Sequence, residues 1–103
     1  METSKEGDNH TFDLDQKFTV AEDILFRQVE EEGILLHISS GTYYNLNETS
    51  ILFWEALTDS KPLSPVVEQI TNEYEVEREY VLKDLQTFLQ DLSQNQLIIP
   101  FTA

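Results

Sequence analysis

Hydrophobic residues in the first half of the chain fall into short runs separated by turn residues, a spacing typical of β-strands. The runs Ile24–Val29, Ile34–Ile38 and Thr42–Leu46 are rich in β-branched, aliphatic and aromatic side chains, which favour extended backbone. Ile34–Ile38 is apolar on both faces, so we expect it inside a sheet. The three runs therefore predict an antiparallel meander, with Thr42–Leu46 as its last strand and at an edge.

The turns between these runs carry their own signals. Glu30 to Gly33 separates the first two strands, and Gly33 is expected to adopt positive φ there. Ser39-Ser40-Gly41 matches a three-residue hairpin loop with glycine at the left-handed position. Upstream, the apolar residues between Phe12 and Val20 alternate weakly, which predicts a less regular strand before the other three.

A strand passes directly into a helix at Asn47, and we expect the core of the domain to lie at this corner. The Asn47 side chain can accept hydrogen bonds from the free N–H groups of a first helical turn. Leu46 precedes this cap and Ile51 follows it by four residues, which is the spacing of a hydrophobic staple. Ile51, Trp54 and Leu57 then continue at helical spacing.

The second half of the chain repeats its apolar residues at helical spacing and predicts two further helices. Ser64 is expected to cap the first, with Pro65 at its first helical position. The second is expected to run from Glu77 to Gln94 and to stop at Asn95, because asparagine tolerates left-handed backbone. Its apolar face is wider than one core stripe requires, and comprises Val81, Leu82, Leu85, Phe88, Leu89 and Leu92.

The whole pattern predicts one α+β domain. A chain of 103 residues has the length of a single domain. Residues 1–10 are polar and acidic, which predicts a disordered tail. Residues 11–103 then form the domain, with a three-stranded antiparallel sheet followed by three helices, an order of elements typical of winged-helix-like units.

The charge balance limits the classes of partner. Asp and Glu number 20, whereas Lys and Arg number only 6, giving a formal net charge of −14. Binding a phosphate backbone requires clustered basic side chains, so nucleic acid is not an expected partner. The acidity serves either solubility or the attraction of a basic partner.

Localisation is inferred from what the sequence lacks. There is no cysteine, which fits a reducing compartment. No apolar run approaches the roughly 18–20 residues that span a bilayer, and the acidic N-terminus is unlike a secretory signal. We therefore expect a cytoplasmic protein with no membrane partner.

No group of residues has the spacing of a catalytic or metal site. Of the two histidines, His10 falls in the tail and His37 in a strand, where a hydrogen-bonded structural role is expected. Neither has a partner at metal-ligand spacing. The acidic run Glu30–Glu32 is typical of a solvated turn, and three glycines offer no phosphate-binding loop. We therefore expect a binding protein without enzymatic activity, cofactor or metal.

The most characteristic stretch of the chain is Ser40-Gly-Thr-Tyr-Tyr-Asn-Leu-Asn, with Trp54 following it. Together with Leu35-Leu36 upstream, it resembles the PqqD-like family. Members of this family are leader-peptide chaperones, or recognition elements, of ribosomally made and post-translationally modified peptides. The resemblance extends over Phe12–Ile99, nearly the whole chain.

This resemblance implies a three-stranded sheet, three helices and no enzymatic activity. It also implies that the leader segment of a precursor binds as an added strand beside Thr42–Leu46, against the last helix. Main-chain hydrogen bonds of an edge strand give affinity, and side-chain pockets give register. The peptide-binding residues expected on these two walls are Thr42, Tyr43, Tyr44, Asn45, Leu46, Arg78, Leu82, Leu85, Gln86 and Leu89.

Several interpretations remain open on the sequence. The full Ser-Gly-x-Tyr-Tyr-x-Leu-Asn match favours a lasso-peptide pathway, in which such a protein delivers the precursor to a separate leader peptidase or modifying enzyme. The related alternative is the chaperone of pyrroloquinoline quinone synthesis. His37-Ile38, where family members often have Asp, leaves the subfamily open.

Two further classes of protein also stay open. One is a winged-helix DNA-binding regulator, which the net charge disfavours. The second is a protein adaptor outside any peptide-modifying pathway. For the helix residues of the expected groove, ordinary core packing is the competing interpretation.

Overall fold

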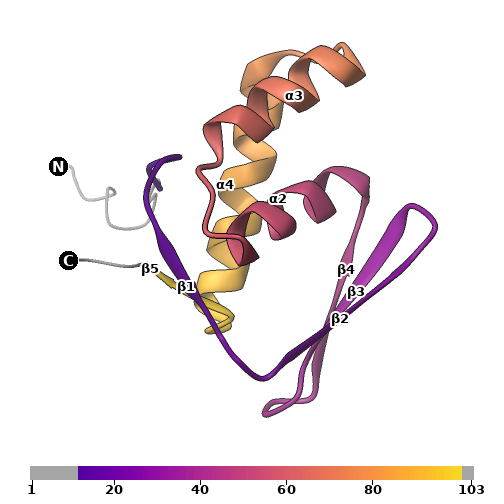
Figure 1. Cartoon of the computed structure of the whole chain (residues 1–103), viewed down its shortest axis with the longest axis vertical. Coiled ribbons are helices and arrows are strands. Elements are labelled where there is room, and N and C mark those ends of the chain that lie inside the picture. The colour runs from indigo at the N-terminus through magenta and orange to yellow at the C-terminus, as the bar shows by residue number, and fades with distance from the viewer. Residues whose placement is uncertain (1–11, 101–103) are drawn as a thin grey trace, which may run out of the picture.

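The computed structural model describes residues 12–100, which form a three-stranded antiparallel sheet, three helices and a separate two-stranded ribbon (Figure 1). The elements in chain order are β1 Phe18–Val20, β2 Ile24–Val29, β3 Glu32–His37, β4 Thr42–Leu46, α2 Glu48–Thr58, α3 Ser64–Tyr74, α4 Arg78–Gln94 and β5 Ile98–Pro100. The helices gather on one side of the molecule, and the hairpins of the sheet extend away from them (Figure 1). The predicted α+β class, with the meander before the helices, is confirmed.

The sheet has the order β2-β3-β4, so β3 is its central strand and β4 an edge strand, as predicted. The register pairs Leu35 with Tyr44 and Leu36 with Tyr43. The row containing Leu35 faces the helices, because this side chain is fully buried in the core. The adjacent row points the other way, since successive side chains alternate between the faces of a sheet. We call these the inner face and the outer face.

The N-terminal segment does not extend the meander. β1 pairs with β5 instead, with Phe18 opposite Pro100 and Val20 opposite Ile98. Leu97 and Ile98 are buried, so the chain packs back onto the core after α4. Their pairing with β1 is not evident from the sequence, because a three-residue strand is too short for its alternation to identify a partner.

Positive φ angles occur in both hairpin turns, but only one of them falls on a glycine. Gly41 has a φ of 72°, which confirms the left-handed position predicted for the β3–β4 turn. In the β2–β3 turn, positive φ falls on Glu30 at 59°, and Gly33 lies within β3. The prediction for Gly33 is therefore wrong. A Cβ at this position would lie 2.7 Å from Cε1 of Phe26, so the ring would have to shift to admit it.

The corner between β4 and α2 forms as predicted. The Asn47 side chain accepts a hydrogen bond from the backbone N–H of Ser50 at 2.9 Å. Leu46 and Ile51, the staple pair, are both buried, and Trp54 is 4% exposed in the same core. This corner fixes the direction in which α2 leaves the edge strand.

The N-cap of α3 differs from the prediction by one residue. The N-cap position of α3 is Leu63, and no side chain caps this helix. The Ser64 hydroxyl donates instead to a carboxylate oxygen of Asp15 at 2.9 Å, which ties α3 to the N-terminal segment. α4 ends at Gln94 with Asn95 as its C-cap, as predicted, but the left-handed residue is Gln96, with a φ of 66°.

The core lies between the inner face of the sheet and the helices. α4 contributes four buried side chains to it: Val81, Leu85, Leu89 and Leu92. Leu82 and Phe88 are partly buried against the same core and lie on opposite margins of this stripe, given 3.6 residues per turn. Core packing therefore accounts for the width of the apolar face of α4.

Candidate functional site

The free edge of β4 is the first wall of the candidate site. β4 pairs with β3 along its whole length, and no strand within residues 12–100 pairs with its other edge. Leu46 is buried on the inner face, whereas Tyr43, on the outer face, is 68% exposed. An unpaired edge presents N–H and C=O groups with which an added chain can form hydrogen bonds.

The helix α4 stands near this edge without packing on it. No Cα atom of β4 lies within 8 Å of a Cα atom of α4, and α2 contacts both elements. An added strand lies about 4.8 Å from its neighbour, so the position beside β4 that it would take is not occupied by the α4 backbone. β2 forms the other edge of the sheet, and no Cα atom of a described helix lies within 8 Å of a Cα atom of β2.

Three residues define the side of α4 that faces α2 and β4. The Phe88 ring lies against Phe53 of α2, with centroids 6.2 Å apart. Asp84 lines a small hollow together with Phe53. Asp91 lies close enough to the Tyr44 phenol to help raise its pKa, the larger cause being burial of the hydroxyl. This side of α4 is therefore aromatic and acidic.

The Tyr44 hydroxyl is a polar atom without a partner in this region. Its oxygen is buried and makes no hydrogen bond within the described chain. Burial without a hydrogen bond favours the neutral phenol over the phenolate, which explains the direction of the pKa shift. Tyr44 thus links the inner face of the edge strand to α4 through packing and proximity to a carboxylate.

Three of the α4 residues predicted to bind peptide lie beside the N-terminal segment. The Gln86 side-chain amide accepts a hydrogen bond from the Phe12 backbone N–H and donates one to its carbonyl oxygen, both at 2.8 Å. Leu82 and Arg78 line the same hollow of ≈470 Å³ with Phe12 and Leu14. These residues lie on the opposite margin of α4 from Phe88 and Asp91. The position of the N-terminal segment on α4 is not evident from the sequence, because nothing in the weak Phe12–Val20 alternation indicates where that segment lies.

The remaining predicted residues divide between the edge strand and the core. Leu85 and Leu89 are 0% exposed and offer no surface in this structure. The structure thus brings Thr42–Leu46 together as one open edge, and separates this edge from Arg78, Leu82 and Gln86. Contact of any of these residues with a peptide stays a prediction. Phe88 and Asp91, which lie nearer to β4, were assigned to the core or given no role by the sequence pattern.

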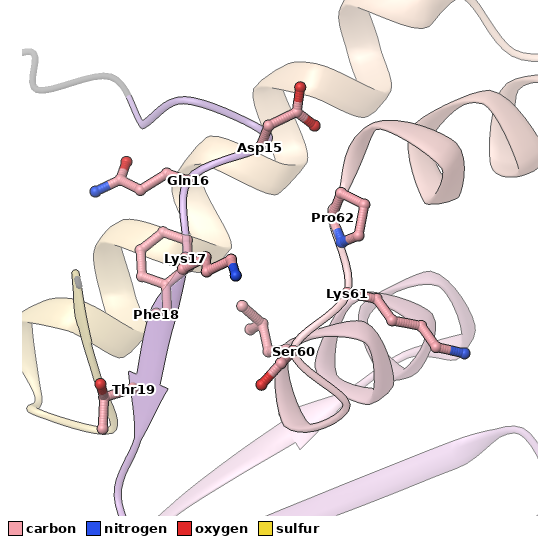
Figure 2. Close-up of a pocket in the computed structure, with 9 residues that line it drawn as sticks. Asp15, Gln16, Lys17, Phe18, Thr19, Ser60, Lys61 and Pro62 are labelled. Carbon is pink, nitrogen blue, oxygen red and sulfur yellow. The ribbon is translucent and has the colours of Figure 1, made fainter. Parts of the chain in front are cut away.

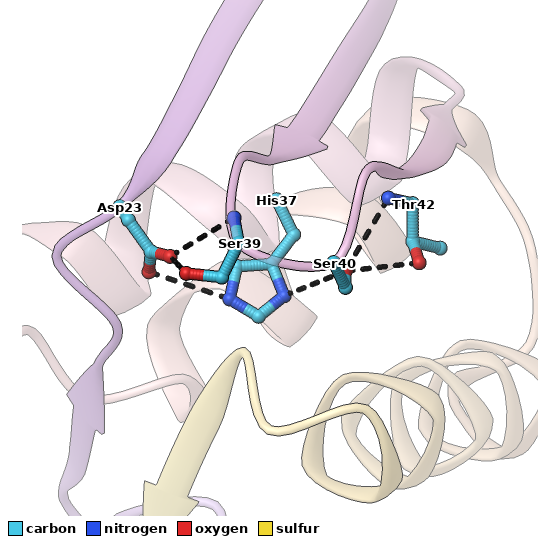
Figure 3. A network of polar contacts seen from close by, with 5 residues as sticks. All are labelled: Asp23, His37, Ser39, Ser40 and Thr42. Atoms are coloured by element: carbon cyan, nitrogen blue, oxygen red, sulfur yellow. Dashed lines mark hydrogen bonds and ion pairs between the residues drawn. The ribbon is translucent and has the colours of Figure 1, made fainter.

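A polar network fastens the turn that leads into β4 (Figure 3). The Asp23 carboxylate lies 3.3 Å from His37 Nε2 and accepts hydrogen bonds from the backbone N–H and the hydroxyl of Ser39. The bond from the Ser39 hydroxyl is the main cause that holds the Asp23 pKa below its usual value. His37 Nδ1 lies 3.1 Å from the Ser40 hydroxyl, which is also bonded to Thr42.

This Asp23–His37–Ser40 order matches the carboxylate–imidazole–hydroxyl order of a hydrolase triad. The Ser40 hydroxyl, however, donates to Thr42 Oγ1 at 3.0 Å and accepts from the Thr42 backbone N–H at 3.3 Å, so it serves the turn. His37 contacts Ser40 and Asp23 through its two ring nitrogens, in agreement with the predicted hydrogen bonding. The network positions the first residue of the edge strand.

A larger hollow of ≈730 Å³ lies elsewhere, between the residues leading into β1 and the α2–α3 loop (Figure 2). Lys17 extends toward it, whereas Lys61 points away (Figure 2).

Within residues 12–100, no group of three or more His, Asp or Glu side chains is placed to hold a metal ion. None of the described helices is both long and apolar enough to cross a membrane. The β4 edge with α4 therefore remains the candidate site.

Known proteins place this geometry in context. The family model for coenzyme PQQ synthesis protein D (PqqD) matches residues 32–98. The fold is similar to that of TbiB1 in complex with the TbiA(beta) leader peptide, with 28% identity and a TM-score of 0.69 over 82% of this chain and 98% of that one. It is also similar to lasso peptide synthetase B1 complexed with the leader peptide, with 31% identity and a TM-score of 0.71 over 82% and 99% of the two chains. No curated protein sequence matches.

Proposed function

The chain belongs to the PqqD family, and we propose that it binds the leader segment of a ribosomally made precursor peptide in a lasso-peptide pathway. One observation carries this proposal: two solved proteins of the same fold, at 28% and 31% identity, are complexes with leader peptides. This chain matches 98% and 99% of their lengths, so the likeness includes the whole of each neighbour.

The proposed mode of binding is strand addition at β4. The leader pairs in extended form with Thr42–Leu46, whose outer edge is unpaired within the described chain. Backbone hydrogen bonds supply affinity, and side-chain contacts set the register. On the opposite wall, the position of Tyr44 near Asp91 favours Phe88 and Asp91 over Leu82 and Gln86 as contacts.

The chemistry of the two walls favours a particular kind of leader. Aromatic and aliphatic leader side chains suit Phe88 and the inner face of β4. Basic leader side chains suit Asp84, Asp91 and the net charge of −14. Charge complementarity accelerates encounter more than it tightens the final complex, so the association rate should fall as salt rises.

The chain then acts by presentation and not by catalysis. A separate leader peptidase or modifying enzyme carries out the chemistry on the bound precursor. The cytoplasm, where ribosomal precursors are made, is the proposed location. The Asp23–His37–Ser40 network supports this division of labour, because its hydrogen bonds stabilise a turn.

A second candidate is the leader-binding chaperone of pyrroloquinoline quinone synthesis. It is favoured by the description of the matching family model, coenzyme PQQ synthesis protein D. The same edge strand would serve in both cases. The two candidates differ in which precursor peptide binds, and a direct comparison of the two peptides separates them.

The test is a titration of ¹⁵N-labelled protein with synthetic leader peptides of lasso-peptide precursors. Amide shifts are expected to concentrate on residues 42–46 and 84–91, with submicromolar to micromolar affinity. A scrambled leader of the same composition controls for non-specific charge attraction. Shifts confined to the Glu30–Gly33 turn and residues 64–74 would exclude strand addition, even if the peptide bound tightly.

A further inference from the structure

The polar network before β4 joins an imidazole ring to two hydroxyl groups in a row (Figure 3). His37 Nδ1 lies 3.1 Å from Ser40 Oγ, and Ser40 Oγ lies 3.0 Å from Thr42 Oγ1. The backbone N–H of Thr42 also donates to Ser40 Oγ, at 3.3 Å. A hydroxyl has a single hydrogen to donate, so the direction of one bond in this row determines the direction of the next. We refer to His37, Ser40 and Thr42 as the relay.

The second ring nitrogen of His37 has one fixed role. Nε2 lies 3.3 Å from the Asp23 carboxylate, and an ionised carboxylate only accepts hydrogen bonds. The Ser39 hydroxyl donates to the same carboxylate and is the main cause that lowers the Asp23 pKa, so Asp23 stays ionised in neutral and mildly acidic solution. Nε2 therefore carries a hydrogen in both states of the ring, and only Nδ1 gains or loses a proton.

Two hydrogen-bond arrangements satisfy the relay, and they differ by one proton. With Nδ1 protonated, the ring donates to Ser40 Oγ, and the Ser40 hydroxyl donates to Thr42 Oγ1. With Nδ1 unprotonated, the ring can only accept, so the Ser40 hydroxyl donates to His37 and the Thr42 hydroxyl donates to Ser40 Oγ. The change requires one proton from solvent at Nδ1 and rotation of two hydroxyl groups.

The relay ends on the first residue of the open edge strand. Thr42 is exposed and lies opposite His37 in the β3–β4 register. When the ring is charged, the Thr42 hydroxyl hydrogen is free to donate to another molecule. When the ring is neutral, Ser40 takes that hydrogen, and the Thr42 oxygen only accepts. The relay thus converts the charge of a ring in β3 into a change of hydrogen-bonding chemistry at β4.

The groups around the ring make His37 the residue that titrates. The charged group that faces it is Asp23, from the connection between β1 and β2. Its neighbours in the sheet are Ile24 of β2 and Thr42 of β4, neither of which titrates. Histidine is the side chain whose charge ordinarily changes between about pH 5 and 8.

From this geometry, we propose that protonation of His37 reverses the hydrogen bonds of the relay and so determines whether the open edge of β4 begins with a donor or an acceptor. The reversal is a property of the turn and needs no ligand. Its effect on a bound peptide rests on the proposed leader binding, because the leader is the molecule that pairs with this edge. The relay would then regulate leader affinity by pH.

The experiment is an NMR titration of the ¹⁵N-labelled full chain between pH 5 and 8. The ring nitrogen shifts of His37 report its protonation and tautomer, and the Thr42 amide shift reports the bond from its N–H to Ser40. Ser40→Ala removes the middle of the relay. Ser39→Ala is the matched control in the same turn, because Ser39 bonds to Asp23 and not to the relay.

In the wild type and in Ser39→Ala, the Thr42 amide should titrate with the same midpoint as the His37 ring, and Nε2 should keep its hydrogen throughout. In Ser40→Ala, the ring should still titrate, which also shows that the variant is folded, but the Thr42 response should be largely lost.

Leader affinity is the second readout, measured with synthetic leader peptides of lasso-peptide precursors at pH 5.5 and at pH 8. A freed Thr42 hydroxyl can donate to a leader carbonyl. Relative to Ser40→Ala, the wild type should therefore gain about threefold in affinity at the lower pH, as expected for one modest hydrogen bond.

Two results would overturn the relay. They are a wild-type Thr42 amide that does not follow the His37 titration, and a Ser40→Ala variant whose Thr42 amide responds as in the wild type. Equal pH dependence of leader affinity in the two proteins would overturn the regulation of binding. A wild type that binds no leader at either pH would instead contradict the proposed function, and the titration without leader would still decide on the relay.

Discussion

The Tyr44 side chain combines a stabilising ring with a hydroxyl that gains no hydrogen bond. The ring packs against the core, and the buried oxygen has no partner within the described chain. An unsatisfied buried hydroxyl costs about 1–3 kcal/mol. Removing the oxygen while keeping the ring should therefore raise the free energy of unfolding without opening a large cavity.

We therefore predict that Tyr44→Phe raises the free energy of unfolding at pH 7 by about 1 kcal/mol. The pKa of the Tyr44 phenol is raised in the fold, so the folded state favours the proton. The raised pKa therefore adds to the free energy of unfolding. This stabilisation is complete below the unfolded pKa of about 10 and declines as the pH rises above it. Tyr44→Phe should flatten that alkaline decline in urea unfolding. Tyr43→Phe, on the exposed outer face, is the control, and a Tyr44→Phe midpoint below that of the wild type would contradict the prediction.

Trp54 tests the core at the same scale. It is 4% exposed beside the staple of Leu46 and Ile51. Trp54→Ala should lower the free energy of unfolding by roughly 3–5 kcal/mol, as expected for truncation of a buried aromatic side chain. Urea unfolding followed by circular dichroism measures the change. A midpoint equal to that of the wild type would mean that Trp54 contributes nothing to the core.

At the scale of the element, α4 presents two margins with different neighbours. One carries Phe88 and Asp91, near α2 and Tyr44. The other carries Leu82 and Gln86 under the N-terminal segment. The two margins give opposite expectations for leader binding, so charge reversals on a single helix can distinguish them.

Asp91→Lys should weaken leader binding by about tenfold, or 1.4 kcal/mol. The substitution replaces a carboxylate that attracts a basic leader with an ammonium group that repels it. Glu79→Lys is the matched control, since Glu79 lines the hollow with Phe12 and Leu82. Fluorescence anisotropy with labelled leader measures both. If Leu82→Asp lowers leader affinity tenfold and Asp91→Lys binds normally, the leader binds at the Leu82 and Gln86 margin that the sequence first predicted.

The helices and strands could be predicted from the sequence better than the contacts between them. The Asn47 cap, the Gly41 turn and the Thr42–Leu46 strand each depend on local geometry, and each is found as expected. Gly33 was misassigned because its requirement comes from the Phe26 ring on the adjacent strand. The two margins of α4 were not separable, because periodicity identifies an apolar face without naming the segment that covers it.

At the scale of the whole molecule, net charge restricts the partners. A chain of −14 repels a phosphate backbone, and its few basic residues form no cluster in the sequence. We predict no binding to duplex DNA at about 0.15 M salt, measured by gel shift with a random duplex. Submicromolar retention would contradict this, because non-specific binding by DNA-binding proteins is typically only about 10⁻⁴–10⁻⁶ M.

The ribbon of β1 and β5 has a consequence for gene architecture. It places Phe18 opposite Pro100, so the first and the last strand of the described chain lie at neighbouring points. Both points lie across the helices from β4 (Figure 1). A second domain fused at either end would therefore leave the open edge of the sheet accessible.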